Sequence, residues 1–449
     1  MNLFGNMLVR SLVEKGIQLA VENPQRNLSH VVKCAETFAG DEDYKKMAAT
    51  VKKNLTDTNS NWYEFAVKHL EYTDANIAQR MLTNLLVHAS LLGLTKRNML
   101  AEEIGMQVPW AILMDPTEKC NLGCTGCWAG GYQKKQELDL TTMDRVCSEA
   151  EEIGIHFIVL SGGEPLLRWN DIAQLAERHP NQLFHIFTNG TLVTANVIED
   201  IKRTGNIILA LSIDGLEKKT DLRRGKGIFK KLMDTMDLLR ESRCLFGVST
   251  TYTRDNTEEL SCDEFIDMVI KKGAAFAWYF TYIPIGRDVD LGYMATPEQR
   301  KYIYERIRYF RKTKPIFTID FWNDGEAIEG CIAGGRKYFH INAAGEVEPC
   351  AFIHYSTCNI KNISLREALR NPLFKAFQQR QPFNKNHRCP CPLIDNPNAI
   401  REIVRESGAY STQQNSSEST DAFAAKMQKY AEAWDRIAKN LQEKERSGT

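Results

Sequence analysis

The residues WAILMDPTEKCNLGCTGCW (110–128) decide the fold of this chain. Their first part, 110–117, is a short apolar run that predicts a buried β-strand. Directly after that run come three cysteines, Cys120, Cys124 and Cys127. The sequence therefore predicts a strand that leads straight into a cysteine-rich loop.

Five similar apolar runs follow, separated by helical segments that end at stops such as Gly154 and Pro180. Repeated βα units predict an α/β fold with a parallel sheet and helices outside it. Eight units normally need about 250 residues, so we expect a partial (β/α)6 barrel. The further strands are predicted at 156–163, 183–190, 207–214, 245–253 and 276–284.

Segments of a different character flank these strands. Before them, apolar residues recur at intervals of three and four, which predicts helices. After them, YFHINAAGEVEPC (338–350) predicts a hairpin that turns at Ala344-Gly345, and a linker at 413–420 precedes a polar terminal helix. The predicted parts are an N-terminal helical region (1–105), a core domain (106–315), a small Cys-rich C-terminal domain (316–400) and a helical tail (401–449).

Composition narrows the class of protein. The 449 residues carry 57 basic and 57 acidic side chains, and this neutrality argues against a nucleic-acid partner. Apolar runs reach only about seven residues, whereas a membrane span needs about 20. The amino terminus lacks a signal-peptide pattern, so we expect a cytoplasmic protein. There, the 12 cysteines serve metal or redox chemistry more readily than disulfides.

The spacing C-x3-C-x2-C lets Cys120, Cys124 and Cys127 wrap one metal centre, and Gly123 and Gly126 permit the tight backbone path. Structural zinc sites and most iron–sulfur clusters take four protein ligands. A triplet without a nearby fourth ligand favours a cluster with one iron left open. A zinc site completed by a distant Cys or His is the alternative.

The next three strand ends carry polar and glycine-rich residues: SGGEP (161–165), TNG (188–190) and SIDG (212–215). Gly162 and Gly163 would let the backbone approach a ligand closely, and Glu164 offers an acceptor. Ser212 and Asp214 reach the same edge, since the carboxyl ends of parallel strands lie together. We therefore expect one cofactor across this edge.

Together these motifs resemble those of the radical SAM enzymes, over about residues 110–315. CNLGCTGC is similar to the family's cluster loop, GGEP to its motif for the amino group of S-adenosylmethionine, and SIDG to its ribose-contacting strand. The resemblance implies a [4Fe-4S] cluster on Cys120, Cys124 and Cys127 and a bound S-adenosylmethionine. The cofactor-binding residues it implies are Gly162, Gly163 and Glu164 for the amino group, Ser212 and Asp214 for the ribose strand, and Arg224 for the carboxylate.

The resemblance also implies the chemistry. An electron from a donor such as flavodoxin or ferredoxin cleaves S-adenosylmethionine reductively to a 5′-deoxyadenosyl radical, which abstracts hydrogen from a substrate C–H. The aromatic sixth strand (276–284) would shield that radical, or it is ordinary core. One position departs from the family pattern, because the aromatic residue expected before the third cysteine is Gly126, and Trp128 follows instead.

A second group of cysteines lies in the C-terminal region. The spacing C-x13-G-x4-C from Cys331 to Cys350 resembles the opening of SPASM or shorter twitch domains, which bind auxiliary iron–sulfur clusters. The dense cysteine run of a full SPASM pattern does not follow, so we expect one auxiliary cluster; free thiols or zinc are the alternative. Its candidate ligands, in decreasing order, are Cys331, Cys350 and Cys391, then Cys389, then Cys358.

Some residues admit two interpretations. Asp324 and Glu326, just before Cys331, could act on substrate or simply favour a turn. The segment 217–231 has seven basic and two acidic residues and is either a solvated face, which would include Arg224, or a rim for an anionic partner. The scattered Cys34, Cys147, Cys244 and Cys262 are interpreted as small buried residues, and His340 and His354 as structural.

The sequence thus predicts a radical SAM oxidoreductase or modifying enzyme with a SPASM/twitch-like domain. Its substrate is a small molecule or a peptide or protein; the helical region before the core shows no strand pattern of a winged-helix peptide-recognition domain, which weakens the peptide hypothesis slightly. A non-catalytic iron–sulfur or zinc-binding scaffold is the alternative from a different class.

Overall fold

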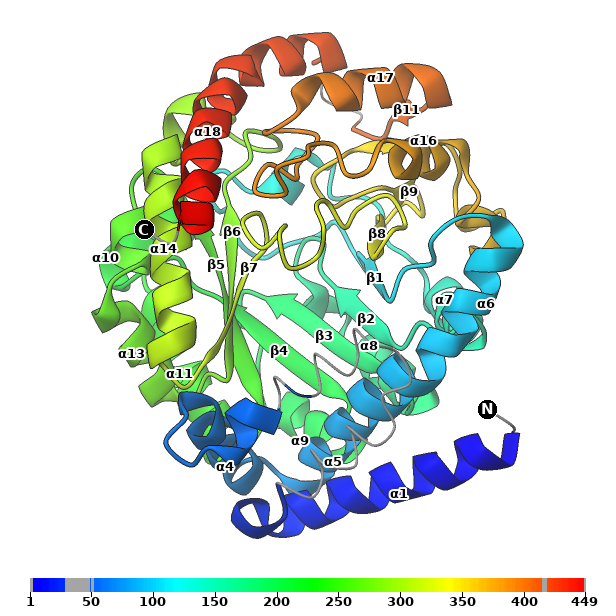
Figure 1. Cartoon of the computed structure of the whole chain (residues 1–449), viewed down its shortest axis with the longest axis vertical. Helices are drawn as coiled ribbons and strands as arrows, with labels where there is room; N and C mark the ends of the chain where they lie inside the picture. Colours follow the sequence, from blue (N-terminus) through cyan, green and yellow to red (C-terminus); the bar gives the residue numbers. More distant parts are fainter. Residues whose placement is uncertain (1–2, 29–48, 50–51, 414–417, 448–449) are drawn as a thin grey trace.

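The computed structural model describes residues 3–28, 49, 52–413 and 418–447 (Figure 1). Half of the linker predicted at 413–420, residues 414–417, lies outside the described residues, and so does Cys34.

The six predicted strands form successive neighbours of one sheet, and every pairing among them is parallel. The α/β prediction is therefore confirmed. The strands are β1 (Ala111–Met114), β2 (Phe157–Leu160), β3 (Leu183–Thr188), β4 (Ile207–Ser212), β5 (Phe246–Tyr252) and β6 (Phe276–Thr281). The outer helices are α7 (Leu140–Glu152), α8 (Trp169–Arg178), α9 (Ala195–Thr204), α10 (Glu217–Arg224), α11 (Ile228–Glu241), α12 (Thr257–Leu260), α13 (Asp263–Lys272) and α14 (Pro297–Thr313).

The sheet extends further than the sequence predicts. β7 (Phe317–Asp320) pairs with β6 in parallel, although the core was expected to end at residue 315. At the other edge, β8 (Tyr338–Ile341) pairs in parallel with β1. The predicted hairpin is present, because β9 (Val347–Glu348) returns antiparallel to β8. The Cys-rich region therefore shares the sheet of the barrel.

Alternate residues of each strand face either the helices or the inside of the barrel, as a strand's period of two requires. Ile112 and Met114 are fully buried in the core beneath the outer helices. Inward positions carry large aromatic side chains, and Gly247 of β5 makes room for one of them. A Cβ at this glycine would lie 2.3 Å from the Phe276 ring, so any larger residue would displace that ring.

The N-terminal helices lie across the amino-terminal end of the barrel, opposite the C-terminal helices (Figure 1). They are α1 (Leu3–Glu22), α4 (Asn61–Tyr72), α5 (Ala75–Leu82), the π-helical segment η1 (Thr83–Leu92) and α6 (Gly93–Ile104). Side-chain amides fasten them to the barrel: Asn76 donates to the Lys202 carbonyl at 2.7 Å and Asn84 to the Gln182 carbonyl at 2.9 Å. This region closes the end away from the polar strand ends.

The remaining elements of the C-terminal region lie over the other end (Figure 1). They are β10 (Tyr355–Ser356), α15 (Leu365–Ala368), α16 (Pro372–Arg380), α17 (Pro397–Ser407), β11 (Tyr410–Ser411) and α18 (Thr420–Ser447). The long α18 runs beside α14, where the Arg300 guanidinium lies 4.1 Å from the centre of the buried Trp434 ring. Arg300 also forms a fully buried ion pair with Asp395. These contacts join the tail to the barrel.

Candidate active site

A cavity of about 250 Å³ occupies the inside of the barrel. At the carboxyl ends of the strands it is lined by most of the predicted site residues, and its other end is aromatic. The predicted residues that line it are Cys120, Cys124, Cys127, Gly162, Gly163, Glu164, Ser212 and Arg224. The structure therefore brings the cysteine loop and three strand ends together around one space.

The cysteine loop is fixed by backbone hydrogen bonds to neighbouring segments. The Thr125 amide donates to the Arg223 carbonyl at 3.0 Å, and the Arg287 amide donates to the Cys127 carbonyl at 3.0 Å. Burial raises the pKa of the Cys120 thiol to about 11 and also raises that of Cys127. Such thiols become thiolates readily only when a cationic group, such as iron, binds them.

The donor set fits an iron–sulfur cluster. In the part of the chain that the structure describes, no three Cys, His, Asp or Glu side chains are grouped tightly enough for a single metal ion. A four-iron cluster spreads its thiolates around a cube of several atoms, and three thiols around one cavity suit that geometry.

The GGE segment at the end of β2 packs directly against the cysteine loop. A Cβ on Gly163 would lie 2.1 Å from the Lys119 carbonyl oxygen, so only glycine fits there. The Gly163 amide donates to the Thr117 carbonyl at 2.9 Å, and the Glu164 amide to the Lys119 carbonyl at 2.8 Å. Since these amides are engaged, the segment can offer carbonyl oxygens to a ligand, and carbonyl oxygens accept hydrogen bonds from an ammonium group.

The Glu164 carboxylate ties two strand ends together. It is 1% exposed and accepts hydrogen bonds from the Thr188 hydroxyl at 2.6 Å and from the Asn189 amide at 2.8 Å. Burial raises the pKa of Glu164, and these hydrogen bonds partly offset the rise. The side chain therefore holds the β3 end beside the β2 end.

Asp214 is predicted as a cofactor-binding residue, but the structure places it behind the cavity wall. It is fully buried and accepts from Arg223 Nη1 at 2.8 Å, Arg224 Nε at 2.6 Å and the Thr251 amide at 2.9 Å. Burial opposes its ionisation, yet the two arginines lower the pKa of Asp214 to about 2. It thus orients two guanidinium groups that do line the cavity.

Arg223 is a site residue that sequence analysis missed. It lines the cavity next to the predicted Arg224, and its side chain is 8% exposed. The Arg224 side chain is 9% exposed, so the interpretation of Arg224 as a solvated residue is wrong. The pair Arg-Arg within the basic segment 217–231 is the signal that could have indicated both.

The position that departs from the family pattern has a structural explanation. A Cβ on Gly126 would lie 2.7 Å from Tyr282 Cε2, so a ring from the end of β6 occupies the space beside the loop. Tyr293 packs edge-on against Tyr282, with ring centroids 5.0 Å apart. Trp128 instead stacks on the His354 ring, with ring centroids 6.2 Å apart. Tyr282 therefore supplies the aromatic surface beside Gly126.

A second, smaller cavity lies in the Cys-rich region. Cys331, Cys350 and Cys391 line it together, and burial raises the pKa of each thiol to about 12. The Tyr338 hydroxyl lies 2.6 Å from Cys350 Sγ and donates to it. The residues that separate this cavity from the barrel cavity line both: Phe321, Ile332, Tyr338 and Phe352.

The two other predicted ligands of the second cluster lie elsewhere. Cys389 packs with Tyr304 and Trp434 in a separate apolar cluster beneath α18. Cys358 is half-buried against the main core, and its carbonyl accepts from the Val347 amide at 3.1 Å. Neither is among the residues that line the second cavity. The structure thus does not place either of them around this cavity with the other three cysteines.

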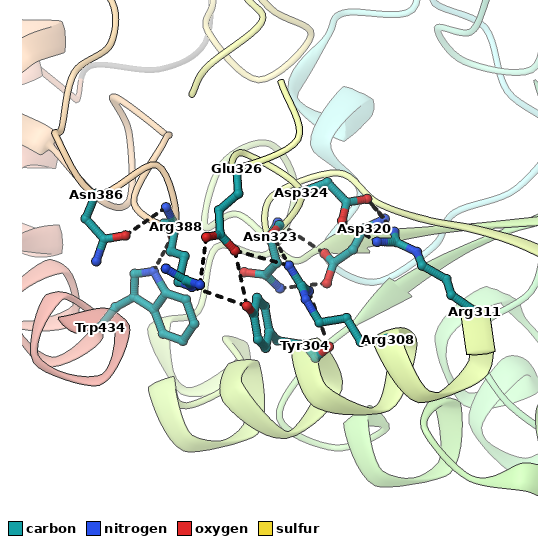
Figure 2. A network of polar contacts seen from close by, with 10 residues as sticks. All are labelled: Tyr304, Arg308, Arg311, Asp320, Asn323, Asp324, Glu326, Asn386, Arg388 and Trp434. Carbon is teal, nitrogen blue, oxygen red and sulfur yellow. Dashed lines mark hydrogen bonds and ion pairs between the residues drawn. The ribbon is translucent and has the colours of Figure 1, made fainter. Parts of the chain in front are cut away.

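Asp324 and Glu326 belong to the polar network of Figure 2. Neither is among the residues that line the two cavities. Arg311 Nη1 donates to Asp324 at 2.8 Å, and Arg388 Nη2 lies 2.6 Å from the Glu326 carboxylate. Tyr304 also donates to Glu326, at 3.2 Å. The structure thus gives both carboxylates arginine partners, from α14 and from the C-terminal loop, and whether they also act on substrate stays a prediction.

A buried charged network links the strand ends to the hairpin. His340 lies between Asp115 and Glu348, 2.8 Å from each carboxylate. Burial disfavours the charged imidazole, but the two carboxylates raise the pKa of His340 to about 10. His354 extends the network to Tyr132, since its Nδ1 lies 3.6 Å from the Glu348 carboxylate and 3.2 Å from the Tyr132 hydroxyl. Both histidines are buried in this network, which fits the structural role that the sequence predicts.

Comparison with known proteins defines the class. The family model "Radical SAM superfamily" matches residues 114–266, and the model "Iron-sulfur cluster-binding domain", SPASM, matches 331–392. An uncharacterized protein of Methanocaldococcus jannaschii is 31% identical over 59% of this chain and 92% of its own length. The chain belongs to the radical SAM superfamily.

Other relatives carry functional names. The AdoMet-dependent heme synthase of Methanosarcina barkeri is 26% identical over 59% of this chain and 82% of its own length. The mycofactocin maturase MftC of Mycolicibacterium smegmatis is 27% identical over 56% of this chain and 66% of its own. The fold resembles that of Streptococcus suis SuiB in a crystal structure with bound S-adenosylmethionine, with a TM-score of 0.54 and 15% sequence identity. The match covers 80% of this chain and 85% of the SuiB chain.

The protein is thus a radical SAM enzyme with a SPASM domain. Its cofactors are [4Fe-4S] clusters and S-adenosylmethionine. No helix in the described ranges is both long and apolar enough to cross a membrane.

Proposed function

We propose that this enzyme modifies a peptide or protein, with Cys120, Cys124 and Cys127 holding the catalytic cluster. The observation that carries the assignment is that these thiols share one cavity with the GGE segment and two buried arginines. When bound, the cluster and S-adenosylmethionine supply a 5′-deoxyadenosyl radical that removes hydrogen from an unactivated C–H.

The chain's own residues bind and orient the cofactor. The carbonyl oxygens of Gly162 and Gly163 accept from its ammonium group, since the neighbouring amides are engaged. Arg224, with Arg223 beside it, binds the carboxylate, and Ser212 contacts the ribose. Asp214 is a positioning residue, because it touches the guanidinium groups and not the cavity.

The second cavity holds the auxiliary cluster in this proposal. Cys331, Cys350 and Cys391 are its ligands, which leaves one iron without a thiolate from this set. The Tyr338 hydroxyl hydrogen-bonds the Cys350 sulfur and so tunes the electron density there. Electrons reach the enzyme from a cytoplasmic one-electron donor such as flavodoxin or ferredoxin, in an overall oxidoreductase reaction.

Two features support a peptide substrate. Relatives include MftC and the sporulation killing factor maturation protein SkfB of Bacillus subtilis, both named as maturation proteins. The inner part of the cavity is also apolar, and charged lining residues lie only at the cofactor end. The name of the Methanosarcina barkeri relative favours a small molecule as the second candidate. A haem, however, carries carboxylates, and burying them in the apolar part of the cavity without cations would be costly. This cost argues for the peptide substrate.

Anaerobic reconstitution tests the proposal. With iron, sulfide, dithionite and S-adenosylmethionine, the protein should form 5′-deoxyadenosine and bind about eight irons per chain, four per cluster. Bound iron without any 5′-deoxyadenosine would contradict the enzymatic assignment. Zinc retained in place of iron would contradict the cluster assignment. For the substrate, peptides encoded beside the gene should increase 5′-deoxyadenosine formation and change in mass.

A further inference from the structure

The basic segment 217–231 has an outer face that the cofactor site leaves free. The segment carries seven basic and two acidic residues in a chain that is neutral overall. Its two arginines, Arg223 and Arg224, turn inward and pair with the buried Asp214. The other five basic residues are lysines, four of them exposed and Lys219 half-buried: Lys218, Lys219, Lys226, Lys230 and Lys231. The remaining positive charge of the segment therefore lies toward solvent.

Most of these lysines have no counter-ion within the protein. Among the residues that the structure describes, Lys218, Lys226 and Lys231 form no ion pair and no side-chain hydrogen bond. The nearby carboxylate of Asp221 is engaged elsewhere, since it accepts from two backbone amides at the start of α11 at 2.6 and 2.8 Å. The lysines are therefore available to an acidic group from another molecule.

An exposed apolar side chain lies among these cations. Leu222 is 71% exposed, more than any other large apolar side chain in the described part of the chain. Residues four apart on a helix share a face, so Leu222 lies beside Lys218 on α10, and Lys226 follows in the turn after the helix. Protein interfaces combine an apolar centre with a polar rim in this way.

The other side of α10 contacts the cysteine loop. The Arg223 carbonyl accepts from the Thr125 amide at 3.0 Å, and Thr125 lies between Cys124 and Cys127. Thr125 is itself exposed. A protein that binds to α10 would thus reach the surface of the loop that carries the first triplet. Because electron transfer slows steeply with distance, this surface is well placed for a redox partner.

We propose that Lys218, Leu222, Lys226 and the exposed Thr125 form the docking surface of an acidic one-electron donor protein of the flavodoxin or ferredoxin type. This inference rests on the proposed function and adds where the donor binds. Such carriers have a net negative charge, and complementary charge speeds encounter and fixes orientation. Redox encounters also use small interfaces, below about 1,200 Å², which one short helix and the adjoining loop can supply.

The step at this surface is the transfer of one electron. With flavodoxin, the anionic flavin hydroquinone is oxidised to the neutral semiquinone, and the cluster on Cys120, Cys124 and Cys127 is reduced from its 2+ to its 1+ state. No bond forms or breaks and no proton moves. The donor is the reductant, and the protein contributes the surface that holds it beside the loop.

Equilibrium binding to the reconstituted full chain tests the proposal. Purified oxidised flavodoxin and an oxidised ferredoxin are the probes, and calorimetry measures their affinity without any turnover. We expect binding at an ionic strength of about 0.01 M that weakens at least about tenfold at about 0.15 M, because the Debye length shortens from about 30 Å to about 8 Å. An acidic donor on a lysine surface requires this salt dependence.

Variants locate the surface. Lys218→Glu with Lys226→Glu replaces two attractions by two repulsions and should weaken flavodoxin binding at least about tenfold at low ionic strength. Leu222→Ser should weaken it about threefold at both ionic strengths, since salt does not screen an apolar contact. Lys312→Glu with Lys429→Glu makes the same charge change at exposed positions of α14 and α18 and should leave binding unchanged.

A reductant that needs no docking separates this inference from the proposed function. With dithionite, all of these variants should form 5′-deoxyadenosine at the wild-type rate, whereas reduced flavodoxin should support the reaction poorly in the Lys218 and Lys226 double variant. A protein that binds flavodoxin in the expected order but forms no 5′-deoxyadenosine with dithionite contradicts the function and supports the docking surface.

Three results would overturn the inference. They are no binding of either donor at low ionic strength, equal flavodoxin binding by the wild type and the Lys218 and Lys226 double variant, and an equal loss in the control pair. The second result, combined with lost affinity for an acidic peptide encoded beside the gene, would assign the surface to the substrate instead of the donor.

Discussion

The two cysteine triplets of this chain are built in opposite ways. Cys120, Cys124 and Cys127 lie on one loop after β1, and each remains partly exposed. Cys331 and Cys350 flank the hairpin of β8 and β9, Cys391 comes from a later loop, and the three line one cavity where these segments pack together. The first triplet is a local motif set on a scaffold, and the second is a product of tertiary packing.

Removal of one ligand from the first triplet should have the largest effect. Cys120→Ala should remove about four irons per chain and reduce 5′-deoxyadenosine formation by at least about a thousandfold, since the cofactor chemistry depends on this cluster. The global fold should persist, because a partly exposed loop contributes little core. Iron analysis, product chromatography and circular dichroism check this. Full iron content in the variant would contradict the assignment.

The paired substitution in the second triplet should act differently. Cys331→Ala with Cys350→Ala should also remove about four irons but leave S-adenosylmethionine cleavage without substrate within about threefold, because the first cluster stays in place. Loss of a buried metal site should also lower the unfolding temperature.

Matched controls sharpen this result. Cys358→Ala and Cys389→Ala change cysteines of the same region that lie outside the cavity, so both should retain about eight irons. If Cys389→Ala also lost four irons, the three-cysteine assignment would be wrong.

The local triplet and the strand ends were predictable because short motifs encode them. Each glycine and polar residue of SGGEP, TNG and SIDG follows a strand whose apolar run is visible in the sequence. The sixfold parallel order followed from the alternation of strands and helices.

Other features that distant segments build were not predictable, although the spacing of Cys331, Cys350 and Cys391 did indicate the second triplet. β7 is a four-residue edge strand with an exposed Phe317, too short for a clear apolar pattern. The pairing of β8 with β1, and Tyr282 in the space beside Gly126, depend on contacts that no local pattern marks. Arg223 could be found in the sequence, but only the buried Asp214 distinguishes it from a solvated arginine.

The cavity at the first triplet also contains two arginines, Arg223 and Arg224, that are paired with the buried Asp214. Asp214→Asn tests what these ion pairs contribute. The substitution leaves Arg223 and Arg224 buried without a counter-ion, so we expect a loss of about 3 kcal/mol in the free energy of unfolding. The KM for S-adenosylmethionine should rise, because the guanidinium groups lose their orientation. Chemical denaturation and initial rates measure both effects.

The pH dependence of stability shows whether the ion pairs of Asp214 cause the expected loss of stability. The pKa of Asp214 is lowered to about 2 in the folded protein from an ordinary value of 3.8. Its stabilising contribution is therefore complete above about pH 4 and is lost as the pH falls toward 2. Asp214→Asn should lack this part of the acid transition. An unchanged acid profile in the variant would show that the ion pairs do not stabilise the fold.

Glu326→Gln should have the smallest effect. It tests whether Glu326, which is near Cys331 in sequence, also acts together with the second triplet. Glu326 is five residues from Cys331 in sequence, but its carboxylate meets Arg388 and Tyr304 in the network of Figure 2. Neutralising a half-exposed partner of Arg388 should cost about 1 kcal/mol of stability. Iron content and the rate of 5′-deoxyadenosine formation should stay at the wild-type level. A tenfold fall in turnover with unchanged stability would instead mean that the C-terminal region brings Glu326 to the substrate, and the two triplets would then share a catalytic surface that the cavity lining does not include.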